Sequence, residues 1–233
     1  FLRYTYYILR GEKMKPVIDV SYHNGVLDWE RINPQIDGAI LRCGYGQNIP
    51  SQDDPQFERN ARECTRLGIP WGVYLFSYAR NVAEALGEAE HVLRLVRDKN
   101  MQLPIYYDIE YSDYQGDLTP EQFTNIAIAF CERIKQAGGF VGIYANTYYW
   151  QTKLYDPRLD AYTRWIAQYS GEVTIDIPYK LWQYSEKGRI EGSSEYTDVN
   201  RYYGDFLTMS GRQNYFAYWN CCCQDTTNCL RRK

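Results

Sequence analysis

The chain has 233 residues and a formal net charge of −3 at pH 7. A weakly acidic chain without a basic stripe is poorly suited to bind phosphate backbones, so we expect no nucleic-acid partner. No apolar run reaches about 18 residues, which argues against a membrane-spanning helix, and we expect no membrane insertion. The length is typical of a single α/β barrel, which commonly needs roughly 200–250 residues.

Aromatic residues make up 16% of the chain and include 24 tyrosines. Tyrosine rings could stack against sugar rings in a groove, but they could equally fill the edge of the core. The seven cysteines lack the even count of a disulfide framework, and Cys43, Cys64 and Cys131 are expected to be small buried apolar residues. The other four crowd into "CCCQDTTNC" without CxxC spacing or a nearby histidine, so we expect neither a zinc site nor a cofactor.

Both ends of the chain differ from its middle. Residues 1–13, "FLRYTYYILRGEK", lack the apolar core and cleavage site of a signal peptide, and Met14 directly precedes a strand-like run. We therefore expect an N-terminal extension over 1–13, one domain over 14–208, and a poorly ordered cysteine-rich tail over 209–233.

Strand and helix signals alternate from residue 17 onward. Over 54–68, Asp54 is a candidate N-cap, Pro55 occupies the first helical position and Gly68 ends the apolar pattern, which predicts a helix. A short helix is predicted to open at "WERI". Apolar runs bounded by turn residues predict the first three strands at 17–22, 38–46 and 69–78.

Two longer helices continue the alternation. Asn81, with Glu84 three residues later, predicts the start of a helix over 81–100, and Thr119 with Gln122 predicts a capping box for the next helix. The fourth and fifth strands are predicted at 103–113 and 140–146.

The spacing tightens after residue 155. Three more strands are predicted at 164–169, 179–184 and 196–200, without room for full helices between them. Five strand–helix units followed by three strands predict an α/β fold, a single TIM-like (β/α)5(β)3 barrel.

Two acids close the fourth predicted strand, "LPIYYDIEYSD". Residues i and i+2 of a strand share a face, so Asp108 and Glu110 point the same way with Cα atoms about 6.5 Å apart. Burying either carboxylate is costly unless it is paired, hydrogen-bonded or neutralised. The two acids could cap backbone groups or pair with Arg42, or they could carry chemistry.

Further acids occupy comparable positions on other strands. The C-terminal ends of parallel barrel strands meet at one mouth, and we place Asp19 and Asp198 at such ends of the first and last strands. Converging carboxylates push some pKa values up and leave others low. That separation supplies the proton donor and the ionised partner of glycoside hydrolysis.

Aromatic residues accompany these acids. Aromatic rings beside acids are typical of a sugar-binding cleft, although β-propensity alone also places rings on strands. His23 lies in a loop and could touch a ligand, whereas His91 lies in a charged helix and is expected to be solvated. HExxH, GxSxG, GxGxxG and P-loop motifs are absent from the sequence. The strand-end rings are Tyr74, Tyr78, Tyr144, Trp165, Tyr169, Trp182 and Tyr184.

A series of short motifs resembles one enzyme family when read together. They are "DVSYHNG", "AILRCGYG", "WGVYLFSYA", "YYDIE", "GIYAN", "WIAQY", "LWQYS" and "TDVN". Their order over roughly residues 17–206 is similar to that of the glycoside hydrolase family 25 lysozymes, the muramidases of phage endolysins and bacterial autolysins. The resemblance implies a catalytic (β/α)5(β)3 barrel that cleaves the β-1,4 bond from N-acetylmuramic acid to N-acetylglucosamine in bacterial peptidoglycan.

The resemblance also implies roles for single residues. Glu110 resembles the general acid, and Asp108 resembles the partner that stabilises the developing charge. The favoured mechanism is retaining, with the substrate's acetamido group attacking and Asp108 orienting it, while inverting attack by water stays open. Asp19 and Asp198 resemble flanking acids, and the candidate substrate contacts are Tyr74, Tyr78, Tyr144, Trp182 and Arg42.

The chain departs from the family at two points. A histidine often stands where this chain has Leu75, which implies that one polar contact of the groove is missing. Few residues follow the barrel, and we expect them to be too few for the separate wall-binding module of many endolysins unless a metal or disulfides stabilise it.

Two other functions are weighed against the muramidase. A non-catalytic sugar-binding barrel would be expected to lack one of the four acids, and a carbohydrate deacetylase is disfavoured by the missing metal-ligand histidines. By analogy with endolysins, we expect a monomer without a signal peptide. It would be made in the host cytoplasm, released by another factor, and would act on the bacterial cell wall.

Overall fold

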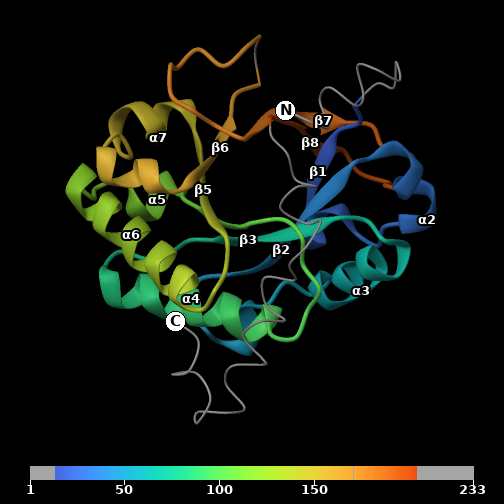
Figure 1. Ribbon diagram of the computed structural model, residues 1–233, viewed down its shortest axis with the longest axis horizontal. Coiled ribbons are helices and arrows are strands. Elements are labelled where there is room, and N and C mark those ends of the chain that lie inside the picture. The colour runs from blue at the N-terminus through green and yellow to red at the C-terminus, as the bar shows by residue number, and fades with distance from the viewer. Residues whose placement is uncertain (1–13, 170, 204–233) are drawn as a thin grey trace, which may run out of the picture.

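The computed structural model describes residues 14–169 and 171–203. The predicted extension over 1–13 and the predicted tail over 209–233 lie outside the described residues. Eight strands form a closed barrel in sequence order (Figure 1). They are β1 (Val17–Val20), β2 (Gly38–Tyr45), β3 (Trp71–Phe76), β4 (Ile105–Asp108), β5 (Val141–Asn146), β6 (Thr163–Ala167), β7 (Leu181–Gly188) and β8 (Thr197–Tyr202).

Helices lie outside the ring of strands (Figure 1). Every connection from β1 to β6 contains an α-helix, whereas no described residue between β6 and β8 is helical. This arrangement confirms the predicted (β/α)5(β)3 barrel. The α-helices are α2 (Trp29–Ile32), α3 (Phe57–Leu67), α4 (Val82–Val96), α5 (Ser112–Gln115), α6 (Pro120–Gln136) and α7 (Thr147–Thr152).

The two long helices begin where their caps were predicted. The Asn81 side chain accepts a hydrogen bond from the backbone N–H of Glu84 at 3.0 Å, which caps α4. Thr119 and Gln122 form a complete capping box at the start of α6. Both caps satisfy backbone donors that a helix leaves without partners.

The start of α3 differs from the prediction. Asp54 does not cap the helix directly, because its Oδ1 accepts from the N–H of Gln56 and its carbonyl accepts from the N–H of Phe57. The residues after Asp54 form a turn, and the helix begins at Phe57. The other carboxylate oxygen of Asp54 is bound to Arg42, so this aspartate anchors the loop rather than the helix.

Apolar side chains fill two regions. One lies inside the barrel and includes Val17, Ile40, Tyr106 and Trp165, while the larger one lies between the strands and the helices. The three cysteines of the described residues, Cys43, Cys64 and Cys131, are free and buried as predicted. The barrel interior is therefore packed and leaves polar residues at its ends.

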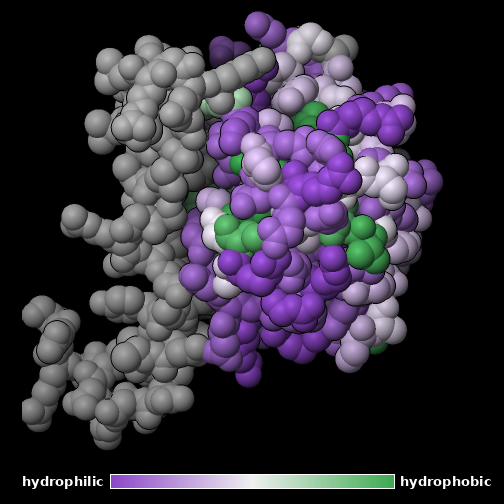
Figure 2. All heavy atoms as spheres, turned by 90° about the vertical axis from the view of Figure 1, so that its right-hand side faces the viewer, coloured by the Kyte–Doolittle hydropathy of each residue, from purple (hydrophilic) through white to green (hydrophobic). Residues whose placement is uncertain are grey.

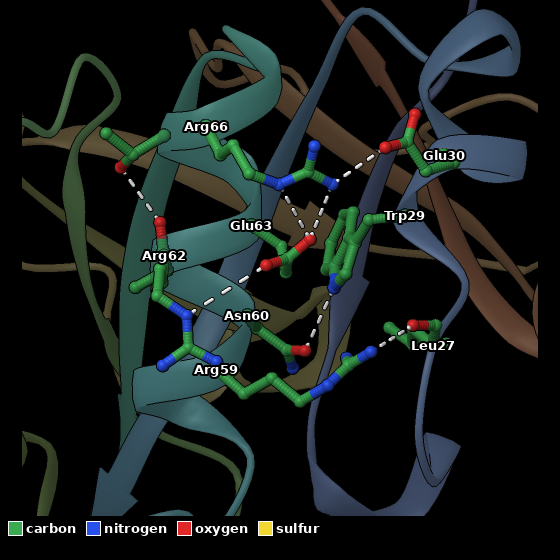
Figure 3. A network of polar contacts seen from close by, with 10 residues as sticks. Leu27, Trp29, Glu30, Arg59, Asn60, Arg62, Glu63 and Arg66 are labelled. Carbon is green, nitrogen blue, oxygen red and sulfur yellow. Dashed lines mark hydrogen bonds and ion pairs between the residues drawn. The ribbon is translucent and has the colours of Figure 1, made fainter.

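The outer face around α2 and α3 is mostly hydrophilic, with only scattered hydrophobic spots (Figure 2). Polar contacts join the two helices here (Figure 3). The Trp29 indole N–H donates to Asn60 Oδ1 at 3.0 Å, and Arg66 bridges Glu30 and Glu63. Within the described part of the chain, no helix is both long and apolar enough to cross a membrane.

Two side chains lie in environments that the sequence did not predict. His91 was expected in solvent but is fully buried, with Nδ1 3.0 Å from the Gly46 carbonyl and Nε2 2.8 Å from Asp53 Oδ1. It thus ties α4 to the loop after β2. Leu75 packs in the core outside the strands, while its neighbour Tyr74 packs inside the barrel. The side chain at position 75 faces away from the mouth. The expectation that Leu75 deprives the groove of a polar contact is therefore wrong.

Candidate active site

The strand directions bring all four predicted acids to one mouth of the barrel. Strands β1 to β7 run parallel to one another, whereas β8 runs antiparallel to both β7 and β1. Asp198 is therefore at the start of β8 and not at its end as predicted, and this start lies at the mouth. It pairs directly with Asp19 in the β1–β8 ladder.

A cleft of about 450 Å³ opens at this mouth. Three of the four acids, Asp108, Glu110 and Asp198, line it directly, and Asp19 lies buried beside Asp198. His23 is among the lining residues, so its position allows the ligand contact that the sequence left open. The remaining lining residues are Ser21, Asn24, Arg42, Tyr74, Phe76, Glu195 and Tyr196.

Asp19 is held by amide side chains. Gln183 Nε2 lies 3.1 Å from both carboxylate oxygens, and Asn200 Nδ2 lies 2.6 Å from Oδ2. The amide oxygens of these residues accept from other groups, Tyr144 and Tyr169 for Gln183 and Trp165 for Asn200. Their N–H groups are therefore directed at Asp19.

Asp108 has a different environment. It ends β4, is 3% exposed, and its Oδ1 is buried without a hydrogen-bond partner among the described residues. Glu110 lies beyond β4, but the N–H of Ile109 still donates to the Tyr144 carbonyl and continues the ladder with β5. Because Ile109 packs in the outer core, the flanking acids face inward as the strand alternation predicted.

Burial raises the pKa values of all four acids above their usual range. For Glu110, the charge of Asp198 adds to the effect of burial, while a hydrogen bond with Tyr144 lowers its pKa. Burial raises the pKa of Asp198 to about 6. The pKa values of Asp19 and Asp108 are raised further, by burial and then by their acidic neighbours Asp198 and Glu110 respectively. The four carboxyl groups therefore keep their protons to higher pH than free carboxyl groups do, and neighbouring acids influence one another's titration.

Arg42 does not pair with Asp108 or Glu110. Its Nε donates to Asp54 Oδ2 at 2.8 Å, and its guanidinium lies 4.7 Å from the centroid of the Tyr22 ring. It still lines the cleft, and its charge lowers the pKa of Asp108 against the larger effect of burial. The alternative in which Arg42 neutralises the two acids as a direct partner is therefore wrong.

Aromatic rings form the floor of the mouth. Trp165 packs edge-on against Tyr144 and Tyr74, with ring centroids 4.5 Å and 6.0 Å away. The Tyr144 hydroxyl donates to Gln183 Oε1 at 2.9 Å and also has a hydrogen bond with Glu110. It therefore connects Glu110 with the amide side chain that holds Asp19. Tyr74 lines the cleft itself.

The other two aromatic candidates lie farther from the acids. Trp182 is on the opposite face of β7 from Gln183, and its indole N–H donates to the Gln168 carbonyl at 2.9 Å. The structure therefore does not bring Trp182 into the cleft, because the alternation of β7 directs it outward. Tyr78 follows β3 and contacts Phe76, which does line the cleft.

Sequence reasoning missed the two residues that hold Asp19, Gln183 and Asn200. It also missed five residues that line the cleft, namely Ser21, Asn24, Phe76, Glu195 and Tyr196. Amide side chains carry no charge and form no motif with Asp19, which is far away in the chain. A weak signal existed, since Gln183 lies between outward positions of β7 and Asn200 lies two residues after Asp198.

The fold and site define a class of protein. A (β/α)5(β)3 barrel with four clustered carboxylates in an aromatic-lined mouth has the architecture of a glycoside hydrolase domain. Residues 18–193, well over half of the chain, match the family model described as Glycosyl hydrolases family 25. The chain therefore belongs to this family.

Solved structures agree with this assignment. The modular autolysin LytC from Streptococcus pneumoniae is 32% identical, with a TM-score of 0.75 over 82% of this chain. The match covers 47% of LytC, so this chain spans about half of that protein's length. The lysozyme from Streptomyces coelicolor is 23% identical with a TM-score of 0.74, covers 88% of this chain and 99% of its own, and supports the fold.

One curated relative is also similar. The uncharacterized protein YegX from Escherichia coli O6:H1 (strain CFT073) is 23% identical over 203 residues, which cover 83% of this chain and 71% of YegX.

Proposed function

We propose that this protein is a peptidoglycan muramidase that hydrolyses the β-1,4 bond between N-acetylmuramic acid and N-acetylglucosamine. The observation that carries the proposal is the contrast between Glu110 and Asp108 in one cleft. Both acids line the cleft with raised pKa values, but Asp108 also has a buried oxygen, Oδ1, without a hydrogen-bond partner among the described residues. The first property suits a proton donor and the second suits an acceptor for a substrate group.

Glu110 acts as the general acid. Burial and the nearby charge of Asp198 keep its proton bound above the usual carboxyl range, so it can protonate the leaving glycosidic oxygen. A general acid of this kind typically contributes about 10²-fold to 10⁴-fold to the rate.

Asp108 orients the substrate's acetamido group. An N–H from this group would satisfy the unpartnered Oδ1, and the acetamido oxygen would then attack the anomeric carbon. This is retaining, substrate-assisted hydrolysis, a known exception to the rule that relates carboxylate separation to stereochemistry. LytC, a family relative 33% identical over the aligned region, has been solved with a synthetic peptidoglycan ligand, which supports the same class of substrate here.

Analysis of the reducing ends tests this proposal. Purified peptidoglycan is digested, the products are reduced with borohydride, and mass spectrometry identifies the sugar at each new end. Reduced muramic acid from the wild type, and none from Glu110→Gln, is the expected result. Reduced glucosamine would place the cleaved bond elsewhere. The absence of new reducing ends on every peptidoglycan tested would favour the non-catalytic sugar-binding barrel.

We also propose that the protein works as an endolysin does, as a monomer on the bacterial cell wall. Light scattering of the purified protein gives its mass in solution. Lysis of cells that express it, with and without permeabilisation of the membrane, tests release by another factor. Lysis only after permeabilisation is expected, and lysis of intact cells would contradict the proposal.

A further inference from the structure

A cluster of aromatic rings lies beside the cleft on the segments that follow β3 and β4. Phe76 lines the cleft, and its ring centroid is 5.5 Å from that of Tyr78 and 5.8 Å from that of Tyr111. The Tyr78 and Tyr111 rings are 5.0 Å apart, and Tyr114 is stacked 6.1 Å from Tyr111. We call these four residues the aromatic wall. It begins at the cleft and extends to Tyr114, which is 46% exposed.

Buried polar contacts fix the two segments that carry the wall. Gln115 Nε2 donates to the Ala79 carbonyl at 2.6 Å and to the Ser77 hydroxyl at 3.3 Å. Glu88, fully buried on α4, accepts from the Ser77 hydroxyl at 2.9 Å and from the N–H of Tyr78 at 2.7 Å. The segments that carry the rings are thus anchored before any ligand arrives, which lowers the entropy lost on binding.

The charge beside the wall is already balanced. Arg80 pairs with Asp117 at 2.7 Å and donates a hydrogen bond to the Tyr114 carbonyl, while its guanidinium lies 5.3 Å from the Tyr114 ring centroid. The wall therefore presents aromatic rings and phenol hydroxyls rather than an unpaired cation for an acidic peptide. Ring faces suit the apolar faces of sugars, and hydroxyls suit their polar edges.

We propose that the aromatic wall binds the peptidoglycan glycan strand beyond the cleaved bond, with Tyr111 and Tyr114 stacking against N-acetylhexosamine rings. This inference rests on the proposed function, because the strand is the substrate of that function. Continuity supports it, since Phe76 belongs to both the cleft and the wall. A strand seated at Glu110 and Asp108 can therefore continue along the wall.

Substrates of two lengths test the wall. Glycan strands freed of peptides serve as the long substrate, and a tetrasaccharide of alternating N-acetylglucosamine and N-acetylmuramic acid serves as the short one. Tyr114→Ala should lower the ratio of kcat/KM on the long substrate to that on the short one by about 3-fold to 10-fold, the size of one lost aromatic contact. Tyr114→Phe should retain the ratio because the ring remains.

The control is Tyr155→Ala, which removes a tyrosine that is 63% exposed and lies outside the wall. Its ratio should equal that of the wild type. A Tyr114→Ala ratio that stays at the wild-type value, or equal losses on both substrates, would overturn the proposal.

A binding measurement separates this inference from the proposed function. Titration calorimetry compares Glu110→Gln with the double variant Glu110→Gln/Tyr114→Ala on the peptide-free strands. Weaker binding by the double variant supports the wall even if the wild type produces no new reducing end, which would defeat the proposed function alone. Equal binding would overturn the wall even if muramidase activity is established.

Discussion

The two sides of the barrel mouth hold their carboxylates in different ways. On the side of β1 and β8, Asp19 accepts hydrogen bonds from Gln183 and Asn200. On the side of β4, Asp108 Oδ1 has no hydrogen-bond partner in the part of the chain that the structure describes. Asp19 and Asp108 are 4% and 3% exposed, so the difference lies in the hydrogen-bond donors around them and not in their burial.

This difference separates a fixed group from a reactive one. A buried carboxylate that already has its donors gains little from a substrate, whereas one without donors is destabilised until a substrate supplies them. Asp19 and its neighbour Asp198 therefore contribute to the electrostatics of the mouth. Asp108 and Glu110 remain able to contact the sugar. Substitutions at these acids should therefore have distinct effects on catalysis and on stability.

Glu110→Gln should have the largest effect on catalysis. The amide cannot donate a proton to a leaving group, so kcat should fall by about 10²-fold to 10⁴-fold while the melting temperature changes little. Steady-state kinetics on soluble glycan fragments measure the loss. The matched control is Glu195→Gln, another acid of the cleft, which should retain most activity. Similar losses in both variants would remove the special role of Glu110.

Asp108→Asn and Asp19→Asn should change stability in opposite directions. The first removes a carboxylate whose buried Oδ1 has no donor among the described residues, so the melting temperature should rise while kcat falls by about 10²-fold or more. In the second, either amide orientation places an N–H group against a donor of Gln183 or Asn200. Stability should then fall by about 1–3 kcal/mol, a decrease of several degrees. Calorimetry measures the melting temperature of each variant, and kinetics measure its kcat. Melting temperatures that change in the same direction in both variants would contradict the difference between Asp108 and Asp19.

Asp198→Asn should move the pH profile of activity. The charge of Asp198 helps to raise the pKa of Glu110, so its removal should lower that pKa. Because the general acid must be protonated, activity should decline at lower pH than in the wild type. The pH dependence of kcat/KM shows the shift. A basic limb that stays in place, or moves to higher pH, would contradict the coupling of the two sides.

Glu88 offers a third buried carboxylate for comparison. Three donors surround it, Ser77, Tyr107 and the N–H of Tyr78, yet burial raises its pKa to about 7. Between its ordinary pKa and about 7 the folded protein holds the extra proton. This contribution to the free energy of unfolding is therefore present at low pH and falls as pH rises, by up to about 1.4 kcal/mol per pH unit.

Glu88→Gln resembles the protonated acid and should flatten this part of the stability curve. Urea unfolding between pH 5 and pH 8 compares the variant with the wild type. An unchanged slope would show that Glu88 does not release its proton in this range.

The barrel itself could be predicted because its signals are local. Period-2 runs, the caps at Asn81 and Thr119, and the short spacing after residue 155 each depend on neighbouring residues. The same holds for Asp108 and Glu110, whose common face follows from strand alternation.

Features that depend on distant contacts could not be predicted in the same way. His91 lies on the buried stripe of α4, but only its contacts with Gly46 and Asp53 show why a polar ring is tolerated there. Tryptophan is a residue type typical of sugar-binding clefts, yet the register of β7 places Trp182 on the outer face. The direction of β8, which brings Asp198 to the mouth, is likewise a property of the closed sheet.

The most direct test of the central claim is the anomeric configuration of the first product. Proton NMR follows the new reducing end of a soluble glycan fragment before the anomers equilibrate. If Asp108 orients the acetamido group for attack, the β anomer should form first. The α anomer as first product would contradict this account, because Asp108 would then serve a water molecule in an inverting reaction.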